Sequence, residues 1–168
     1  MSQYFDIGPD FIKEMKMGAF LTPPPDAKTK PVKGQSEPAY VWRETFVIQD
    51  IDVRSDGDGS EAVLPKFVVP SDVFSSNQGR VASEYFGFPW TAAQNGEKSA
   101  KSQCAISYRS LCEFARAAGY EGDITNLGAF ATSVVPELRN MRVDAQVSVG
   151  PDDNGTPRQH IRYFRAPK

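Results

Sequence analysis

MRVDAQVSVGPDDNGTPRQHIRYFRAP, residues 141–167, is the stretch that most strongly decides the expected fold. From Val143 to Val149, small apolar residues alternate with polar ones, which is the two-residue period of a β-strand with one buried face. Asn154 and Gly155 follow as an Asn-Gly pair, a strong signal for a hairpin turn. RQHIRYFRAP supplies the returning strand. The sequence therefore predicts that the chain closes with an antiparallel hairpin.

Upstream of this hairpin, β-branched and aromatic residues predict further strands at residues 40–54, 62–69 and 79–90. A polar turn with two glycines, SDGDGSE, separates the first two. Pro65 places the second strand at a sheet edge or a bulge, because proline cannot donate to a ladder. We expect a core rich in phenylalanine, which includes Phe46, Phe67 and Phe74.

Residues 99–119 carry the helical pattern of the chain. The apolar positions recur at helical spacing and form one face, made of Cys104, Tyr108, Leu111, Cys112, Ala115 and Ala118. Gly119 supplies the stop. A shorter helical segment follows, with Asp123 as the expected N-cap and Pro136 at the first position of a last helical turn.

These elements predict a mainly β fold with one main helix, of the α+β class. A five-stranded small barrel with a helix before its last strands is the arrangement of the OB-fold, so we expect an OB-like barrel over residues 40–168. A roll or an open sandwich with one packed helix fits the same order of elements.

Residues 1–39 are expected to form an extended N-terminal arm rather than core. One short helix is predicted at residues 10–21. The following TPPPDAKTKPVKGQSEP is rich in proline and lysine, which disfavours helix and sheet and predicts a partly flexible segment.

Size and composition predict a soluble cytoplasmic protein. The chain has 168 residues and no apolar run near the ~20 residues of a membrane helix. Cys104 and Cys112 lie eight residues apart on the expected helix, hence about 12 Å apart, which is too far for a disulfide. We expect both to be reduced, as in an intracellular protein.

The net charge of -2 hides a gradient along the chain. Residues 1–40 carry 0, residues 41–97 carry -5 and residues 98–168 carry +3. A general polyanion binder is usually basic throughout, so composition alone argues mildly against nucleic acid. A local basic patch remains, and such patches position phosphates.

Catalytic and metal-binding motifs are missing from the sequence. One histidine, His160, and two cysteines without CxxC spacing do not make a zinc site. No GxSxG, Walker A or GxGxxG motif is present. Asp56, Asp58 and Ser60 imitate the start of a calcium loop, but Glu61 stands where that loop needs glycine. We therefore expect no enzyme activity, no metal and no cofactor.

Aromatic and cationic residues are interleaved in three stretches, YVWRETF, GRVASEYFGFPW and RQHIRYFR. Cations neutralise phosphates and aromatic faces stack bases, so this pairing indicates single-stranded nucleic acid. Trp90 and one of the adjacent Tyr163 and Phe164 are expected to stack bases. Arg109 and Arg116 either extend the groove or are solvated on the helix. The predicted nucleic-acid-binding residues are Trp42, Arg43, Arg80, Trp90, Arg142, Arg158, His160, Arg162, Tyr163, Phe164 and Arg165.

The order of FVIQDIDV, GRVASEYF, YRSLCEFARAAGY, PELRNMRVDAQVSVG and DDNGTPRQHIRYFRAP resembles small bacteriophage proteins from replication and recombination gene clusters. The resemblance covers about residues 45–167. It implies an OB-like protein that binds single-stranded DNA beside a phage recombinase, helicase or polymerase. Asn140 replaces a glycine that is usual in that group. Asparagine also tolerates positive φ, so we expect the turn to persist.

These observations predict a sequence-tolerant single-stranded-DNA-binding protein that supports phage DNA replication or recombination, and they are compatible with a homo-oligomer. One alternative is a virion or assembly protein whose N-terminal arm reaches a neighbouring subunit. A second is a metal-dependent nuclease that uses the acidic stretch at residues 50–61.

Overall fold

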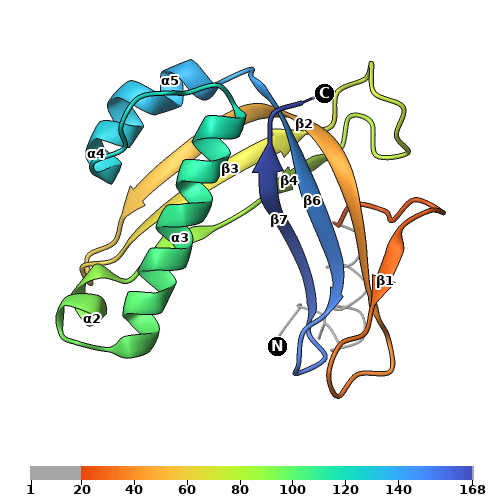
Figure 1. The fold of residues 1–168 in the computed structure, drawn as a ribbon, viewed down its shortest axis with the longest axis horizontal. Coiled ribbons are helices and arrows are strands. Elements are labelled where there is room, and N and C mark those ends of the chain that lie inside the picture. The colour runs from red at the N-terminus through yellow and green to blue at the C-terminus, as the bar shows by residue number, and fades with distance from the viewer. Residues whose placement is uncertain (1–19, 168) are drawn as a thin grey trace, which may run out of the picture.

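The structure is a computed structural model that describes residues 20–167, and its main feature is one antiparallel sheet (Figure 1). Within these residues the order of hydrogen-bonded strands is β4-β3-β2-β6-β7, and β1 and β5 add to β2 and β3. The strands are β1 (Lys28–Lys30), β2 (Ala39–Ser55), β3 (Glu61–Val68), β4 (Val81–Ser83), β5 (Phe86–Phe88), β6 (Arg142–Pro151) and β7 (Pro157–Arg165).

Strand β2 is long enough to serve two halves of the sheet. Its first part pairs with β6 and its second part with β3. A bulge between Ile48 and Asp50 lies close to where the two ladders meet, and such irregularities bend a strand. The sheet therefore curls around its contents instead of lying flat, as Figure 1 shows.

The predicted place of Pro65 at a sheet edge or a bulge was wrong, because β3 pairs on both sides and the bulge lies between Ile48 and Asp50 on β2. On the side of β3 away from β2, β5 pairs with residues 61–63 and β4 with residues 66–68. Pro65 lies in the break between these two short ladders, where a missing N–H removes little pairing.

The helices are α2 (Trp90–Gln94), α3 (Lys98–Ala117), α4 (Leu127–Ala129), the π-helical turn η1 (Phe130–Val134) and α5 (Val135–Leu138). The prediction of the main helix is confirmed by α3, whose buried face includes Cys104, Leu111 and Ala115. Ser107 and Phe114 are also buried there, whereas Tyr108 is exposed. The apolar face is therefore rotated slightly from the expected one.

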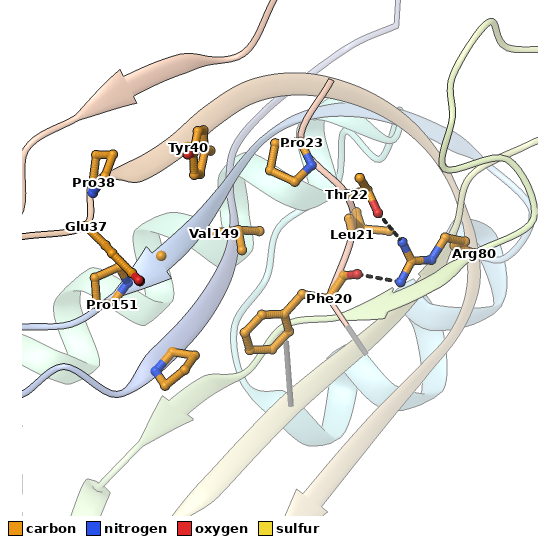
Figure 2. Close-up of a pocket in the computed structure, with 12 residues that line it drawn as sticks. Phe20, Leu21, Thr22, Pro23, Glu37, Pro38, Tyr40, Arg80, Val149 and Pro151 are labelled. Atoms are coloured by element: carbon orange, nitrogen blue, oxygen red, sulfur yellow. Dashed lines mark hydrogen bonds between the residues drawn. The ribbon is translucent and has the colours of Figure 1, made fainter. Parts of the chain in front are cut away.

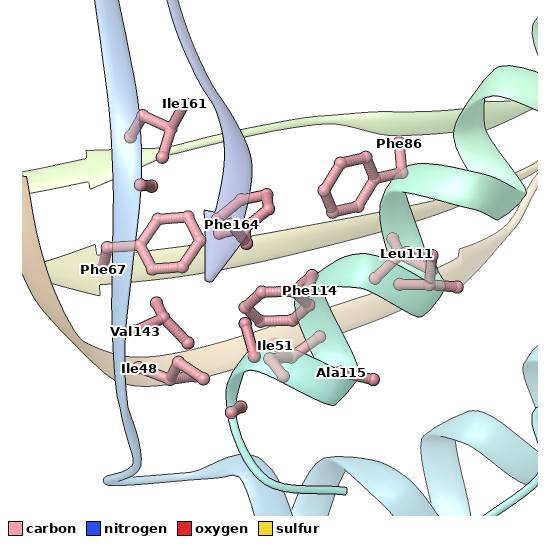
Figure 3. Packing of buried hydrophobic residues seen from close by; sticks show 14 of the residues in the cluster. Ile48, Ile51, Phe67, Phe86, Leu111, Phe114, Ala115, Val143, Ile161 and Phe164 are labelled. Atoms are coloured by element: carbon pink, nitrogen blue, oxygen red, sulfur yellow. The ribbon is translucent and has the colours of Figure 1, made fainter. Parts of the chain in front are cut away.

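Phenylalanine rings fill the space between α3 and the sheet (Figure 3). The ring centroid of Phe114 lies 5.7 Å from that of Phe67 and 5.0 Å from that of Phe164. Phe46 and Phe67 have no exposed surface, as predicted. The prediction for Phe74 was wrong: its side chain is fully exposed on the loop that joins β3 to β4.

Of two local features predicted from the sequence, a turn at Asn140 and an N-cap at Asp123, one is confirmed. Asn140 has φ 68, which confirms that asparagine takes the left-handed turn between α5 and β6. Its N–H donates to Ile48 O at 2.8 Å. The expected N-cap at Asp123 was wrong, because Asn126 fills that position and accepts from Ala129 N–H at 2.7 Å.

The described strands form an open sheet with packed helices, which confirms the mainly β, α+β class. Within residues 20–167 no ladder joins β7 to β4 or β5. The two edges approach each other across a seam, where the carboxylate of Glu84 accepts from Ile161 N–H at 2.6 Å. A side chain thus stands where a closed barrel would have a backbone ladder.

The described part of the predicted arm lies on the sheet. Leu21 is 2% exposed and belongs to the core, and β1 pairs with β2. Buried Asn77 binds the backbone of Thr22 in both directions, accepting from its N–H at 2.8 Å and donating to its O at 2.9 Å. Residues 1–19, with most of the helix predicted at residues 10–21, lie outside the described residues.

Candidate nucleic-acid interface

A β-bulge in β7 sets which side chains of the last strand face outward. Arg162 lies opposite Gln146 and Arg165 lies opposite Asp144, so two residues on β7 oppose one on β6. Tyr163, in the bulge, has φ 55, which is rare for a residue with a side chain. The bulge directs Arg162 and Tyr163 outward together, and it returns Phe164 to the core.

The guanidinium of Arg43 braces this bulge from β2. Its Nη1 donates to Tyr163 O at 2.9 Å, while Nε and Nη2 are buried without a hydrogen-bond partner among the described residues. Burial lowers the pKa of Arg43, and the positive charge of Arg165 lowers it further. The nearby carboxylates of Asp144 and Glu113 raise this pKa, so the cations at the end of β7 lie beside acidic groups.

Two adjoining hollows run along the outer edge of β7, and we call them together the β7 groove. They measure 220 Å³ and 730 Å³ and share Tyr85, Gln103 and Arg162. The groove follows the seam of the open sheet, between β7 on one side and α3 with the β4–β5 segment on the other. Its further lining includes Arg109, Arg158, His160 and Tyr163.

Arginines line the walls of the β7 groove: Arg109, Arg158 and Arg162. No carboxylate among residues 20–167 forms an ion pair with Arg109, Arg162 or Arg165. Arg158 is paired with Asp152 at 3.1 Å, but its side chain stays 59% exposed. One acid, Glu113, also lines the smaller hollow. Arg109 and Arg162 in the groove, and Arg165 at the end of β7, are thus available to neutralise phosphates without first breaking a salt bridge.

At the floor of the groove lies a buried carboxylate that accepts hydrogen bonds from backbone N–H groups. Glu84 accepts from Ile161 N–H at 2.6 Å and from Tyr85 N–H at 2.9 Å. Nδ1 of His160 lies 3.7 Å from the same carboxylate, buried and without a hydrogen bond. Such backbone donors offset the cost of burying a charge. Glu84 therefore joins the two sheet edges and does not offer a free charge to a ligand.

Two tyrosines supply the exposed rings of the groove. Tyr85 is 58% exposed and Tyr163 is 63% exposed. Tyr85 was not among the predicted site residues, although it stands in GRVASEYFGFPW, one of the three stretches that interleave aromatic and cationic residues.

Three of the predicted aromatics lie elsewhere. Trp42 is 8% exposed and donates from Nε1 to Glu44 at 3.1 Å. Phe164 is 5% exposed and packs in the phenylalanine core, so neither ring has a face for a base. Trp90 is half-buried and stacks on Phe88, with ring centroids 5.0 Å apart. The exposed ring of the Tyr163–Phe164 pair is therefore that of Tyr163.

Two of the predicted arginines hold the structure together outside the groove. Arg80 donates to Thr22 Oγ1 at 2.8 Å and to the carbonyl of Phe20, which ties the arm down. Arg142 pairs with Asp72 at 2.7 Å.

Arg109 and Arg116 were each expected either to extend the groove or to be solvated on the helix, and the structure places them differently. Arg109 lines the groove. Arg116 donates to Tyr120 O at 2.8 Å and to Gly122 O at 2.7 Å, where it stabilises the chain leaving α3.

Neither a metal cluster nor a membrane span is found in the described part of the chain. No group of three or more His, Cys, Asp or Glu could hold a metal ion there. No helix within residues 20–167 has the length and apolar character needed to cross a membrane.

Comparison with known proteins adds no assignment. No protein-family model matches the sequence, and no curated protein matches it significantly. The functional argument therefore rests on the β7 groove, in which Arg109 and Arg162, which form no ion pair with the described residues, lie beside two exposed tyrosines.

Proposed function

We propose that this protein binds single-stranded DNA along the β7 groove, with little preference for sequence. The observation that supports the proposal is the juxtaposition of exposed Tyr85 and Tyr163 with Arg109 and Arg162 in one groove, with exposed Arg165 following at the end of β7. Arginines that lack carboxylate partners attract phosphates, and aromatic faces stack any base. The residues proposed to contact DNA through phosphates are these three arginines and Arg158.

We also propose that the sheet is an OB-like barrel opened at its seam. The order β4-β3-β2-β6-β7, with α3 inserted before the last two strands, supports this interpretation. In OB-folds, oligonucleotides lie on the second and third strands and on the loops after the first and fourth. Here those loops contain Asp56, Asp58, Asp152 and Asp153, whose charges repel phosphates. We therefore propose that the DNA lies along the seam instead.

The biological setting comes from the resemblance to phage replication and recombination proteins, which has no support from the comparisons. Under this proposal the protein protects or presents single strands for a recombinase, helicase or polymerase. The groove offers shape, charge and stacking surface for such a strand, and the proposal includes no catalytic step.

The direct test is a titration of fluorescently labelled oligo-dT, oligo-dC and mixed-sequence oligonucleotides at several salt concentrations. We expect similar affinities for all three and a steep loss of affinity with salt, as counterion release requires. No binding at about 50 mM salt, or an affinity that ignores ionic strength, would exclude the proposal.

The groove and the adjoining end of β7 are tested by the double variant R162A/R165A. Each lost phosphate contact on a single strand lowers the slope of log K against log salt by about 0.7, so we expect the slope to fall by about 1.4. Affinity should fall equally for all three sequences. The matched control is R54A/R139A, which removes the same charge from arginines paired with Asp52 and Asp50 outside the groove. Equal slopes for both double variants would place the DNA elsewhere.

A further inference from the structure

The single histidine of the chain, His160, lies on β7 and lines the larger hollow of the β7 groove. Its side chain is 40% exposed. Nδ1 is buried 3.7 Å from a carboxylate oxygen of Glu84, and it has no hydrogen-bond partner among the described residues. Nε2 is not buried. The ring therefore holds one nitrogen against the carboxylate and presents the other to the groove.

The carboxylate of Glu84 decides which nitrogen carries the proton of a neutral ring. A lone pair on Nδ1 would face the negative oxygen, whereas an N–H at the same place is attracted to it. Glu84 is itself fixed by the backbone N–H groups of Tyr85 and Ile161, which donate to it. Nδ1 therefore keeps its proton, and Nε2 gains one when the imidazole becomes a cation. The added N–H donor faces the groove.

Two arginines flank the ring on its own strand. Arg158 and Arg162 lie two residues before and after it, and both line the same hollow. Such residues lie on one side of an extended strand, at intervals of about 7 Å. Arg158 is paired with Asp152, whereas Arg162 forms no ion pair with the described residues. The β4–β5 segment adds the titratable side chains of Glu84 and Tyr85. A protonated imidazole completes a row of three cations along β7.

The other walls of the larger hollow bring no charge to the ring. α3 contributes Gln103 there, while its charged groove residues, Arg109 and Glu113, line the smaller hollow. The arm contributes Phe20, whose carbonyl accepts from Arg80 (Figure 2). The guanidinium of Arg80 is directed to the arm and lines a different hollow. Among the described residues that line the larger hollow, the carboxylate beneath the ring is thus the one negative group.

We propose that the protonated imidazole of His160 is a phosphate ligand of the β7 groove, so that single-stranded DNA binds more tightly as the pH falls. This inference rests on the proposed function and adds a proton-dependent contact to its site. Histidine ordinarily changes charge between about pH 5 and 8, whereas arginine stays a cation throughout. A phosphate bound at Nε2 favours the protonated ring, and by linkage the protonated ring favours the phosphate.

The full chain is titrated with labelled oligo-dT at about pH 5.5 and at about pH 8, over a series of salt concentrations. Thymine and the phosphodiester group keep their charge in this range, so a change in affinity belongs to the protein. We expect tighter binding at the lower pH. The slope of log K against log salt should be steeper there by up to about 0.7, the value for one more phosphate contact on a single strand.

Variants at this position assign the effect. H160Q removes the titrating group and should give the same affinity and slope at both pH values. H160R keeps a cation and should give the steeper slope at both. The matched control H160Q/N95H returns a histidine to an exposed position outside the groove and should not restore the pH dependence. A wild type with equal affinity at both pH values, or a pH dependence that H160Q retains, would overturn this inference and leave the proposed function in place.

Nitrogen NMR of the imidazole tests the role of Glu84 without a variant. The chain has one histidine, so its two ring-nitrogen signals are assigned without ambiguity. We expect Nδ1 to carry a proton at every pH and the signal of Nε2 to move as the pH falls. A neutral ring with its proton on Nε2 would show that the carboxylate does not position the ring, and it would overturn the inference.

Dimethyl phosphate, a single phosphodiester, keeps this inference separate from the proposed function. If the wild type binds no oligonucleotide at either pH, the proposed function fails, and dimethyl phosphate added to the DNA-free chain decides the contact. A shift of the imidazole signals at about pH 5.5, and none at about pH 8, would mean that the phosphate contact of His160 stands alone. No shift at either pH would overturn the contact as well.

Discussion

Tyr163 occupies a backbone conformation that its own side chain disfavours. A left-handed residue with a Cβ costs roughly 1–2 kcal/mol relative to its usual conformation, and φ here is 55. The neighbours hold it there: Phe164 is locked into the core, and Arg43 binds the Tyr163 carbonyl. Glycine would meet this backbone at lower cost. We therefore attribute the tyrosine to its exposed ring and not to the stability of β7.

Replacing Tyr163 by glycine should separate stability from binding. Relief of the left-handed strain is offset by the entropy of glycine, so the free energy of unfolding should change by less than about 1 kcal/mol. Loss of the stacking face should weaken oligonucleotide binding by about 1–3 kcal/mol. Urea denaturation and fluorescence anisotropy measure the two effects, and Y163F should match the wild type in both. A glycine variant that binds as tightly as the wild type would remove this ring from the interface.

The burial of Tyr163 and Phe164 was only partly predictable from the sequence. Alternation predicted that one ring of the Tyr163–Phe164 pair is buried and the other exposed, which the structure confirms. It did not predict which, because the bulge is a property of the pairing between β6 and β7. Trp42 was predicted to bind nucleic acid, but its ring is buried. Its indole N–H donates to Glu44, a contact that forms only in the folded protein.

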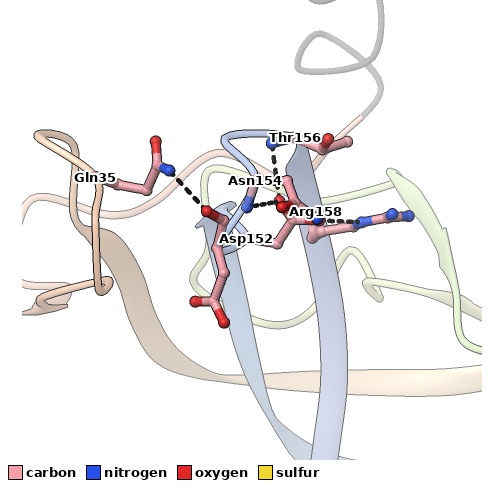
Figure 4. Close-up of polar contacts among 6 residues, drawn as sticks. Gln35, Asp152, Asn154, Thr156 and Arg158 are labelled. Carbon is pink, nitrogen blue, oxygen red and sulfur yellow. Dashed lines mark hydrogen bonds and ion pairs between the residues drawn. The ribbon is translucent and has the colours of Figure 1, made fainter.

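At the scale of elements, the β6–β7 turn is organised by one carboxylate (Figure 4). One oxygen of Asp152 accepts from the N–H groups of Asn154 and Thr156, both at 2.9 Å. The other accepts from Arg158 at 3.1 Å. The hydrogen bond from the Thr156 N–H is the largest cause that holds the pKa of Asp152 below its ordinary value. The Asn-Gly pair predicted the turn, and Asp152 sets its geometry.

Asp152 should make the stability of this hairpin depend on pH. A carboxyl whose folded pKa is depressed stabilises the protein above its unfolded pKa of about 3.9, and this contribution is lost as pH falls through the folded value. D152N keeps an oxygen acceptor without the charge. We expect D152N to unfold at lower urea than the wild type at pH 7, and the difference to shrink below about pH 4. A difference that is constant between pH 7 and pH 2 would show that the charge is not involved.

At the scale of the whole molecule, the sheet is open along the seam between β7 and the β4–β5 segment. Side chains bridge it at two places: Glu84 binds the backbone of β7, and Gln159 of β7 accepts from Leu21 N–H at 2.7 Å. Asn77 holds the next residue, Thr22, against the sheet. Residues 20–22 thus form a strap that covers one part of the seam, while the β7 groove occupies another.

Removing the amide of Asn77 should release this strap. N77A leaves the Thr22 N–H and carbonyl without their partners, so we expect a loss of about 1–3 kcal/mol in the free energy of unfolding. Cleavage by a protease between residues 20 and 39 should become faster, because Leu21 loses its restraint. The control N95A changes an exposed asparagine and should stay within about 0.5 kcal/mol of the wild type. Equal protease sensitivity of the two variants would mean that the strap is held by the Leu21 side chain and by Arg80.

The sequence by itself determined the strands other than β1, the main helix, the hairpin turn and the left-handed Asn140, because each depends on the period or the backbone preference of neighbouring residues. The segment that holds β1 was predicted to disfavour sheet, and it forms a strand by pairing with β2. Only the tertiary structure decided that the sheet stays open, that Phe74 points to solvent, and that Arg80 and Arg142 are engaged in structural contacts. It also decided that Tyr85, Arg109 and Tyr163 share one groove. These outcomes depend on contacts between residues distant in sequence, and no local pattern encodes which distant residues will meet.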